Sequence, residues 1–513
     1  MDYYEARDDL DDPPLEQQED SPIQKLFKGA HVFITGASGF MGRVLLEKIL
    51  RTCDVAQIFI LVRDKKGVKS QERLSSILDD RLFESLKLQK PGEVRKVRVV
   101  TGDCSEPGLG LGQEDLRQMS SVNLIYHVAA NLQMDQHLKI AYTTNVLATK
   151  CLLEFARTLP QLKAFMYVST AYTHAYRDLV EETFYSVIYD EEEIGQICRD
   201  MDDHQIGALT PKLIGRWTNT YALTKACAEN LVSKYDGVLP IGVVRPSIVV
   251  STWREPLVGW INNVYGAVGV VTGTALGLMR LWCADPDMVG DMIPVDTAIN
   301  MTLAATWEVA VSNTQLKIYN LVSSPKNPIT YDILRTANFG HGANERMESI
   351  NSIAVPSFML VKNKTAFTLL SIWYHVIPGI LMDMYLQFIG KTPKLKKVYT
   401  KIYNVNKNLM PYCVDHDIVF TANNVDRLWE TLDPLDKKLF LYDLRQLDWD
   451  YFWLQGLKGM RVYLINEPMD TVPQGIKHYR KLLIRKLLFD SIIWSFLGTL
   501  GYLILKSVVS PYL

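Results

Sequence analysis

The chain has 513 residues, of which 48% are hydrophobic and 22% are charged, and its formal net charge is −2. This length and composition exclude a disordered chain, a collagen-like repeat and a small disulfide scaffold, and they suggest about three domains. The seven cysteines are widely spaced and form no CxxC pair, so neither a zinc ribbon nor a dithiol redox motif is predicted, and we expect reduced thiols.

The beginning of the chain is strongly acidic. Residues 1–20 contain nine acidic residues and one basic residue, whereas the rest of the chain has 54 basic and 48 acidic residues. We therefore expect residues 1–22 to form a solvated, disordered tail, and the segment lacks the apolar stretch of a secretory signal. The mildly basic remainder suits an anionic small molecule or a membrane surface, and it is too weakly basic for nucleic-acid binding.

Short aliphatic runs recur through the first half of the chain, separated by stretches long enough for helices. Apolar strands that alternate with helices are typical of a parallel sheet covered on both faces. We therefore predict a Rossmann-like, doubly wound α/β domain over residues 23–355. The predicted strands are 31–35, 57–62, 97–102, 123–130, 164–170 and 241–247, with a helix over 71–86.

The first predicted strand runs into a glycine-rich turn and then a helix. Gly36, Gly39 and Gly42 have the spacing GxxGxxG. The first two permit a tight turn and a close approach of the backbone to a pyrophosphate, the third lets the helix pack against the strand, and the helix N-terminus offers free N–H groups. Because the triplet follows a strand and opens a helix, we predict a dinucleotide site instead of a simple packing turn.

The second predicted strand ends at Arg63, where an NAD site usually has a carboxylate for the ribose 2′-hydroxyl. We expect Arg43, just after the glycine turn, to converge on the same place. Two guanidinium groups favour a 2′-phosphate, so the predicted cofactor is NADPH. The alternative is that Arg63 is an ordinary strand-end charge, and the neighbouring Asp64 argues for that alternative.

A second motif places Tyr221 and Lys225 four residues apart, on one face of a predicted helix. A nearby ammonium favours the phenolate, so we expect Lys225 to lower the pKa of Tyr221 toward physiological pH. Such a tyrosine can donate a proton to a carbonyl oxygen while a hydride arrives at carbon. Ser169 and Thr170 end the fifth predicted strand, at the sheet edge where such folds place their chemistry. The YxxxK spacing is common by chance, but together with the glycine turn and the hydroxyl pair it predicts a reductase site.

After about residue 355, strand-like runs become scarce and aromatic-rich helical stretches such as 366–390 and 424–441 appear. We predict a smaller, mainly helical domain over 356–476, with a lysine cluster over 391–401. The uncharged, apolar stretch 366–382 is open to three interpretations, namely a buried core helix, an acyl-chain pocket and membrane re-entry. A buried core helix is the interpretation that we favour.

The last segment is a candidate membrane anchor, predicted over residues 477–513. Residues 491–505 are 15 uncharged residues, about 22 Å of helix, and continuing to Leu513 gives 23 residues, about 34 Å, if Lys506 reaches the interface. The basic residues upstream would keep the bulk of the protein cytosolic. We favour a spanning helix over an amphipathic helix that lies in the interface. The basic residues are Lys477, Arg480, Lys481, Arg485 and Lys486.

These motifs together resemble the extended short-chain dehydrogenase/reductase family, and within it the alcohol-forming fatty acyl-CoA reductases. The resemblance rests on TGASGFMG, YVSTAY and NTYALTKA, and in the helical part on MDMYLQFIGKTPKLKK and LYDLRQLDW. It covers nearly the whole chain after the acidic tail. It implies NADPH-dependent reduction of long-chain fatty acyl-CoA to a primary alcohol and CoA, through an aldehyde, by two hydride transfers. The alternatives are a membrane-bound oxidoreductase of sterols or sugars and a non-catalytic scaffold that binds NADP or lipid.

The resemblance also implies roles for individual residues. Tyr221 is the expected acid, and Lys225 is its tuner and a ribose contact. Thr170 is expected to orient the substrate carbonyl, with Ser169 as second choice, and Asn145 to be structural or part of a proton relay. The expected cofactor contacts are Gly36, Ser38, Gly39, Phe40, Met41, Gly42, Arg43, Arg63, Asp103, Ala129, Lys225 and Pro246, and no metal is expected. No role is assigned to His127, His174, His204 or any cysteine.

The expected partners follow from the same resemblance. They are a long-chain acyl-CoA substrate and membrane lipid at the C-terminal segment, with homo-oligomerisation left open and no nucleic acid. The expected location is a peroxisomal or endoplasmic reticulum membrane, or a lipid droplet, with the catalytic domain in the cytosol.

Overall fold

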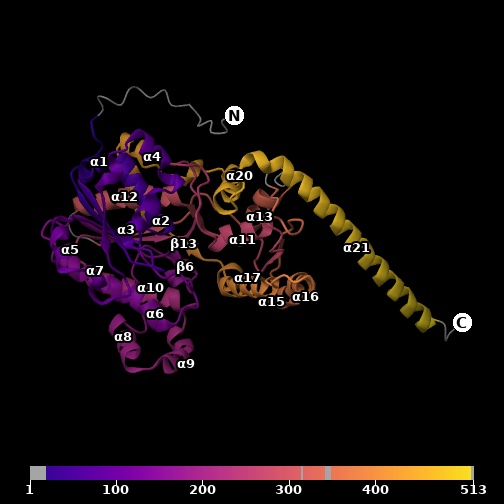
Figure 1. Cartoon of the computed structure of the whole chain (residues 1–513). Coiled ribbons are helices and arrows are strands. Elements are labelled where there is room, and N and C mark those ends of the chain that lie inside the picture. The colour runs from indigo at the N-terminus through magenta and orange to yellow at the C-terminus, as the bar shows by residue number, and fades with distance from the viewer. Residues whose placement is uncertain (1–18, 313–315, 341–347, 510–513) are drawn as a thin grey trace.

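The computed structural model of the chain describes residues 19–312, 316–340 and 348–509 and is built around a seven-stranded sheet (Figure 1). Every neighbouring pair of strands in this sheet is parallel, and the strand order is β11-β7-β5-β4-β1-β2-β3. The order reverses between β1 and β4, which is the switch point where doubly wound folds bind ligands. The strands are β1 (His31–Thr35), β2 (Gln57–Val62), β3 (Val97–Thr101), β4 (Leu124–His127), β5 (Ala164–Val168), β7 (Ile241–Pro246) and β11 (Lys317–Leu321).

Helices cover both faces of the sheet, because alternate residues of each strand point to opposite sides. Val32 and Ile34 of β1 belong to one cluster of buried side chains, and Phe33 between them belongs to another. The first face is covered by α1 (Pro22–Phe27), α2 (Phe40–Thr52) and α12 (Val295–Ser312). The second is covered by α5 (Gln113–Gln118), α6 (Leu138–Tyr142), α7 (Ala148–Arg157) and α10 (Thr220–Ser233). The predicted doubly wound α/β fold is confirmed.

All six predicted strands are present in the sheet, with ends that differ by at most three residues, and β11 was missed. The helix predicted over 71–86 is instead two helices, α3 (Ser70–Leu78) and α4 (Glu84–Gln89). They are separated at Asp80, whose side chain accepts a hydrogen bond from the Leu82 amide and so starts a new turn. The stretch 424–441 is likewise divided into α18 (Asn423–Thr431) and α19 (Pro434–Leu439), because Pro434 occupies a first helical position.

The expected disordered tail lies largely outside the described residues, because the description begins at residue 19. Its last residues are ordered. Ser21 is buried and caps α1, accepting a hydrogen bond from the Gln24 amide while Gln24 accepts one in return. The folded chain therefore begins before the boundary at residue 22 that composition suggested.

Three short parallel strand pairs and several helices complete the molecule. The pairs are β6 (Leu179–Val180) with β13 (Val419–Phe420), β8 (Ile248–Val250) with β10 (Met292–Pro294), and β9 (Leu281–Trp282) with β12 (Met359–Leu360). The remaining helices are α8 (Glu191–Asp200), α9 (Asp203–Ile214), α11 (Gly266–Ala275), α13 (Tyr331–Phe339), α15 (Lys364–Ser371), α16 (Ile377–Phe388), α17 (Leu395–Met410), α20 (Trp449–Gly459) and α21 (Val472–Val509). The region after residue 355 is therefore mainly helical, as predicted.

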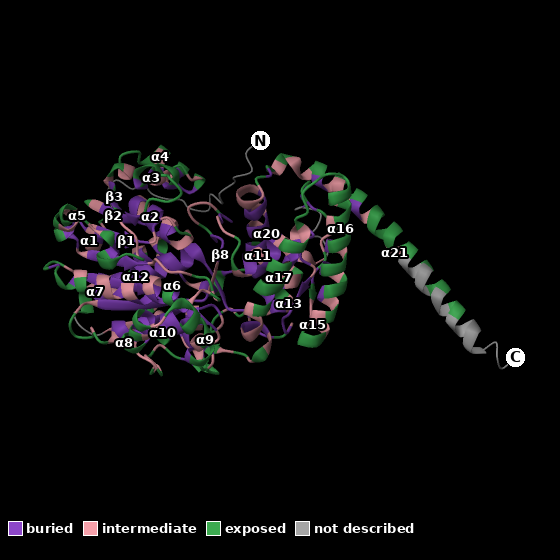
Figure 2. Cartoon of the chain, turned by 60° about the horizontal axis from the view of Figure 1, so that its bottom comes forward, coloured by how far each residue is buried: buried purple, intermediate pink, exposed green. Residues whose placement is uncertain are grey.

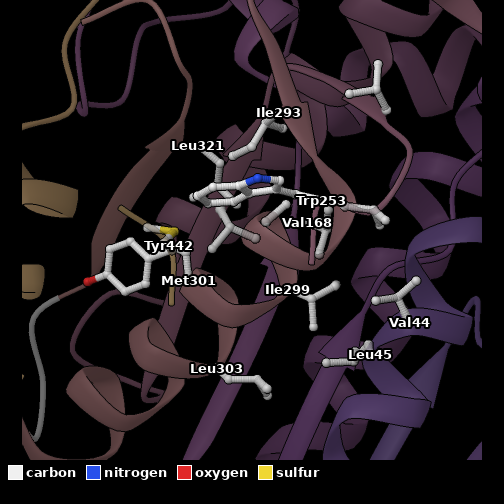
Figure 3. Close-up of a cluster of buried hydrophobic side chains, with 14 of the residues drawn as sticks. Val44, Leu45, Val168, Trp253, Ile293, Ile299, Met301, Leu303, Leu321 and Tyr442 are labelled. Atoms are coloured by element: carbon white, nitrogen blue, oxygen red, sulfur yellow. The ribbon is translucent and has the colours of Figure 1, made fainter. Parts of the chain in front are cut away.

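The helical region does not have a core of its own. One cluster of buried side chains contains residues of α2 and α12 together with residues of α18 and α20. Figure 3 shows Tyr442, from the C-terminal region, in this cluster with Met301 and Leu321. The helical region and the Rossmann-like region are thus packed as one hydrophobic unit.

The buried-core interpretation of 366–382 is wrong. This stretch forms α15, a π-helical turn over Ile372–Val376 and α16, and only about a fifth (22%) of its most apolar window is buried. Within the described part of the chain, Lys364–Phe388 is also the one stretch long and apolar enough to cross a membrane. The stretch packs on the rest of the protein along one side only, so most of its apolar surface remains uncovered (Figure 2).

The last helix, α21, leaves the body of the protein and extends away from it (Figures 1 and 2). Its first turns are held closely, since a Cβ added to Gly475 would lie 1.7 Å from the Glu348 carbonyl oxygen, and His478 Nε2 lies 2.8 Å from the carbonyl oxygen of Ser352. The candidate anchor is helical as far as Val509, and residues 510–513 lie outside the described residues.

Candidate active site at the carboxyl edge of the sheet

The glycine-rich turn joins β1 to α2 next to the end of β4. Gly36 has φ +81°, and a Cβ there would lie 2.6 Å from the Ala129 amide nitrogen, so only glycine fits. A Cβ on Gly42 would lie 2.2 Å from the Gly36 carbonyl oxygen, which is how this glycine lets α2 pack against the turn. The N-terminus of α2, at Gly39, has no side-chain cap. Its first N–H groups therefore have no side-chain acceptor, and the turn fits a nucleotide pyrophosphate.

Three arginines gather beyond the end of β2. Arg73 of α3 donates a hydrogen bond to the Arg63 carbonyl oxygen at 2.5 Å. Burial lowers the pKa of Arg73, and the positive charges of Arg63 and then Arg43 lower it further. The two predicted arginines and Arg73 are therefore within electrostatic reach of one another. Arg73 was missed because it lies ten residues beyond Arg63, on a helix that carries no motif.

Carboxylates balance part of this positive charge. Arg43 pairs with Asp80 at 2.6 Å, and Arg63 pairs with Asp103 at 3.0 Å (N–O distances). The carboxylate of Asp64, which argued for NAD, accepts hydrogen bonds from the Ser70 amide at 2.8 Å and from the Lys69 ammonium at 2.9 Å. The Asp64 carboxylate therefore accepts hydrogen bonds at the start of α3.

The hydroxyl group of Thr170 and the phenol of Tyr221 meet at the carboxyl edge of β5. Thr170 follows the strand, and its hydroxyl group lies close enough to the Tyr221 phenol to lower the pKa of that phenol. It also lies 3.4 Å from the Pro246 carbonyl oxygen, at the end of β7. The Ser169 hydroxyl instead pairs with Thr173 at 3.1 Å. The structure therefore brings Thr170 to Tyr221 and directs Ser169 elsewhere.

The expected lowering of the Tyr221 pKa by Lys225 is not found. Burial raises the pKa of Tyr221 above its usual value and the nearby Tyr412 adds to this, while the Thr170 hydroxyl group opposes it. The Lys225 ammonium instead donates to the Val168 carbonyl oxygen at 2.7 Å. Burial lowers the pKa of Lys225 to about 7. The expectation failed because desolvation is the largest influence on the pKa of each group, and neither group is among the influences on the other.

A buried ion pair lies one helical turn beyond Lys225. Glu229 accepts two hydrogen bonds from Arg245, at 3.0 Å and 2.7 Å, and both side chains are almost fully buried. Arg245 also donates to the carbonyl oxygens of Glu181 and Thr183, so it is fully occupied. The charge of Glu229 partly offsets the effect of burial on the pKa of Lys225. The pair was not predicted; the four-residue spacing from Lys225 to Glu229 on α10 was a signal for Glu229 but not for Arg245.

The helical region contributes Tyr412 to the site. Its phenol forms a short hydrogen bond with the Thr218 hydroxyl and accepts one from the Asn219 amide at 2.8 Å. Asn219 is the N-cap residue of α10, the helix that carries Tyr221. Tyr412 also packs edge-on against Tyr172. No local signal announces this contact, because it joins residues about 190 positions apart.

Polar residues beneath the site are fully engaged. Asn145, in a π-helical turn over Thr143–Leu147, exchanges hydrogen bonds with the Asn131 backbone and donates to Thr224 of α10 at 3.0 Å. His127 lies between the hydroxyls of Thr35 and Thr149, at 2.7 Å and 3.0 Å, and burial lowers its pKa to about 3. Both residues therefore hold neighbouring segments together, and His127 is neutral.

Two protein-family models together match most of the chain. An NAD-binding model and a second model named Sterile, both described as male sterility protein, match residues 34–302 and 374–467. Fatty acyl-CoA reductase wat of Drosophila melanogaster is 35% identical over 91% of this chain and 90% of its own length. Fatty acyl-CoA reductase 1 of Homo sapiens is 34% identical over 90% of this chain and 89% of its own length.

Solved structures with a similar fold include reductase domains from biosynthetic assembly lines. The terminal R domain of the myxalamid PKS-NRPS pathway has a TM-score of 0.54 at 18% identity, covering 85% of this chain and 91% of that domain. The reductase domain of a non-ribosomal peptide synthetase from Mycobacterium tuberculosis has a TM-score of 0.50 at 19% identity, covering 87% and 94%. At this identity the likeness concerns the fold.

Proposed function

The chain belongs to the fatty acyl-CoA reductase family and is an oxidoreductase, and from this premise we propose that it reduces long-chain fatty acyl-CoA to a primary alcohol and free CoA with NADPH. The observation that carries the proposal is the placement of Tyr221, on the helix whose Lys225 contacts the end of β5, beside Thr170 at the carboxyl edge of the sheet. This pair lies in the same edge as the glycine turn after β1, so one bound nucleotide and one carbonyl group can meet there.

The two hydroxyl groups act on the carbonyl oxygen. A reduced nicotinamide nucleotide, when bound, supplies the hydride for each of the two reductions. Thr170 and Tyr221 donate hydrogen bonds to the oxygen on which negative charge develops, and Tyr221 passes its proton to that oxygen. Because burial raises the pKa of Tyr221, the phenol stays protonated at neutral pH and remains a donor. In the first round the thioester loses its thiol as CoA and leaves an aldehyde, and in the second round the aldehyde becomes the alcohol.

Lys225 and the arginines support the choice of NADPH and its placement. Lys225 lies beside the strand end at Val168, where we propose that it binds the nicotinamide ribose. Arg43, Arg63 and Arg73 form a positive group beyond β2 that suits a 2′-phosphate. The engagement of Asp64 with Ser70 removes the carboxylate that would favour NAD. Asp103, paired with Arg63, is placed by the same proposal near the adenine.

Membrane attachment is part of the proposal. The helix α21 extends from the body, carries the exposed basic residues of its first turns and continues into the apolar segment. We place the anchor over 477–513, after a reductase domain over 23–355 and a helical domain over 356–476. By the positive-inside tendency, the body then lies on the cytosolic side of a peroxisomal or endoplasmic reticulum membrane or on a lipid droplet.

The test is a stoichiometry. The detergent-solubilised full chain is incubated with NADPH and palmitoyl-CoA, and NADPH consumed, free CoA and lipid product are quantified. Two NADPH per alcohol and per CoA are expected, because the overall reduction transfers four electrons. One NADPH with accumulating aldehyde would limit the activity to the first step. Absence of CoA release over several chain lengths would contradict the proposal.

A further inference from the structure

The α15–α16 stretch exposes an unusual concentration of large apolar side chains. Twelve of the exposed large hydrophobic residues in the described chain fall within residues 369–389. We call this set the hairpin face, because the helical stretch that carries it packs against the next helix, α17. Phe388 is 89% exposed and Leu369 64% exposed. Large continuous apolar surfaces of this kind mark places that are covered in the functional state. The residues are Leu369, Ile372, Trp373, Val376, Ile377, Ile380, Leu381, Met382, Met384, Tyr385, Phe388 and Ile389.

The opposite side of the same stretch is fixed to the protein. Phe367, Ser371, His375 and Gly379 are buried and recur every four residues, which forms one stripe along the helix. The His375 ring accepts a hydrogen bond from the Arg280 amide at 3.1 Å, and a Cβ on Gly379 would lie 2.6 Å from the Tyr399 ring. The stripe holds the helix against α17, so the hairpin face is presented outward and does not fold back onto the body.

Positive charge adjoins the hairpin face. Six exposed lysines follow Phe388, and none of them forms an ion pair within the described residues. Asp383 is the single acidic residue between 364 and 414, and its carboxylate accepts hydrogen bonds from the backbone amides of Lys394, Leu395 and Lys396. The surface is therefore apolar with a cationic rim. The lysines are Lys391, Lys394, Lys396, Lys397, Lys401 and Lys407.

We propose that the hairpin face docks on a lipid bilayer that contains anionic phospholipids, as a second membrane contact besides α21. Apolar side chains with an aromatic component and a rim of lysines match the boundary between acyl chains and anionic headgroups. The buried stripe favours a helix that lies in the interface over one that crosses the bilayer, because one side of the helix is already bound to protein. The contact holds the reductase body beside the bilayer, where long acyl chains partition.

The test uses the full chain in vesicles of phosphatidylcholine and phosphatidylserine that contain a phospholipid with a photoactivatable group on its acyl chain. After irradiation, the labelled peptides are identified by mass spectrometry. We expect lipid adducts within residues 369–389 as well as in α21. The measurement requires neither nucleotide nor acyl-CoA, so failure of the proposed reductase function leaves its outcome unchanged.

Two variants and a control sharpen the test. The double substitution Leu381→Glu with Phe388→Glu is expected to reduce adducts in the hairpin face about tenfold and to preserve those in α21, because charge is expelled from the acyl region. Lys394→Glu with Lys397→Glu is expected to reduce hairpin adducts in the mixed vesicles and not in phosphatidylcholine alone. The control is Leu88→Glu, which changes a leucine that is 84% exposed in α4 and should alter neither set of adducts.

Three results would overturn the proposal. The first is labelling of α21 without labelling of 369–389, and the second is the absence of lipid adducts from both segments. The third is cross-linking of the hairpin face to a second copy of the chain or to another protein in place of lipid. Thermal unfolding of each variant checks that the body is still folded, and the lysine variant keeps the test decisive if the apolar variant unfolds.

Discussion

At the scale of single residues, burial is the main influence on the pKa of the titratable groups in the site. Tyr221 has its pKa raised, Lys225 has its pKa lowered to about 7, and His127 has its pKa lowered to about 3, each mainly through burial. Each of these shifts favours the uncharged form of its group, whereas Glu229 and Arg245 form a charged pair. A neutral phenol beside the Thr170 hydroxyl can donate its proton to a carbonyl oxygen. Carbonyl reduction requires such a proton donor.

Replacing Tyr221 by Phe removes the proton donor and leaves the ring. We expect the rate of acyl-CoA reduction to fall about 10³-fold, the range of general acid catalysis, while NADPH still binds. Steady-state NADPH oxidation measures the rate, and nucleotide fluorescence measures binding. Tyr451→Phe, which removes the hydroxyl of an exposed tyrosine in α20, should leave the rate unchanged. Activity within a fewfold of the parent in Tyr221→Phe would remove this residue from the mechanism.

Because the pKa of Lys225 is lowered, we expect nucleotide binding to depend on pH. A lysine whose pKa is lowered to about 7 is charged below that pH and loses its proton as the pH rises through it. Because the charged ammonium is the form that we expect to bind the nucleotide, NADPH affinity should weaken as the pH rises above about 7. The dissociation constant measured by fluorescence across this window checks the prediction. In Lys225→Met the decline should disappear, and a decline that persists there belongs to another group.

At the scale of elements, the groups that we propose to bind the nucleotide lie in and beside the short connections after the strands. The turn after β1 requires glycine at Gly36 and Gly42, because added Cβ atoms would collide with backbone. Arg63 lies in the connection from β2 to α3, close to Arg43 of α2 and Arg73 of α3, and Asp64 in the same connection accepts a hydrogen bond from the Ser70 amide at the start of α3. We therefore expect the choice between NADPH and NADH to depend on the connection from β2 to α3 and on the first turn of α3, and not on β2 itself.

Arg73 is predicted to select NADPH over NADH. Arg73→Ala should lower kcat/KM for NADPH about tenfold and change the value for NADH by less than about twofold, because only the former has a 2′-phosphate to pair. Initial rates with both nucleotides give the ratio. Arg117→Ala, which removes an exposed arginine of α5, serves as the control. An equal loss with both nucleotides would assign Arg73 a structural role instead.

At the scale of the whole molecule, the helical region and the Rossmann-like region form one hydrophobic unit. Tyr442 lies in the cluster that contains Met301 of α12, and Tyr412 reaches the N-cap of α10. The backbone of α20 also passes very close to the loop after β8, since a Cβ on Gly459 would lie 1.7 Å from the Gly259 carbonyl oxygen. The two regions should therefore unfold together.

Gly459 offers a test of that cooperativity. Gly459→Ala forces α20 away from Gly259 and is expected to lower the free energy of unfolding by about 3 kcal/mol, as overpacking does. Calorimetry should show one transition that moves as a whole to lower temperature. Gly207→Ala in α9, where an added Cβ has open space, should be neutral or slightly stabilising. Two separate transitions in Gly459→Ala would show that the regions are independent.

The sequence by itself determined the parallel sheet, the glycine turn and the placement of Tyr221 and Lys225 on one helix, because each depends on residues that are close in the chain. Local patterns carry such information through strand hydrophobicity, helix spacing and turn geometry. The family was indicated separately, by the resemblance of several motifs to the fatty acyl-CoA reductases, and the comparisons confirm it.

Only the tertiary structure decided the rest, because those features depend on contacts between distant residues and on exclusion of water. The pKa of Tyr221 goes up and not down because burial is a property of the folded chain. Tyr412 enters the site across about 190 residues. The hairpin face is exposed although its composition is that of a core helix. An apolar sequence indicates that its surface will be covered, but it does not indicate whether protein or lipid covers it.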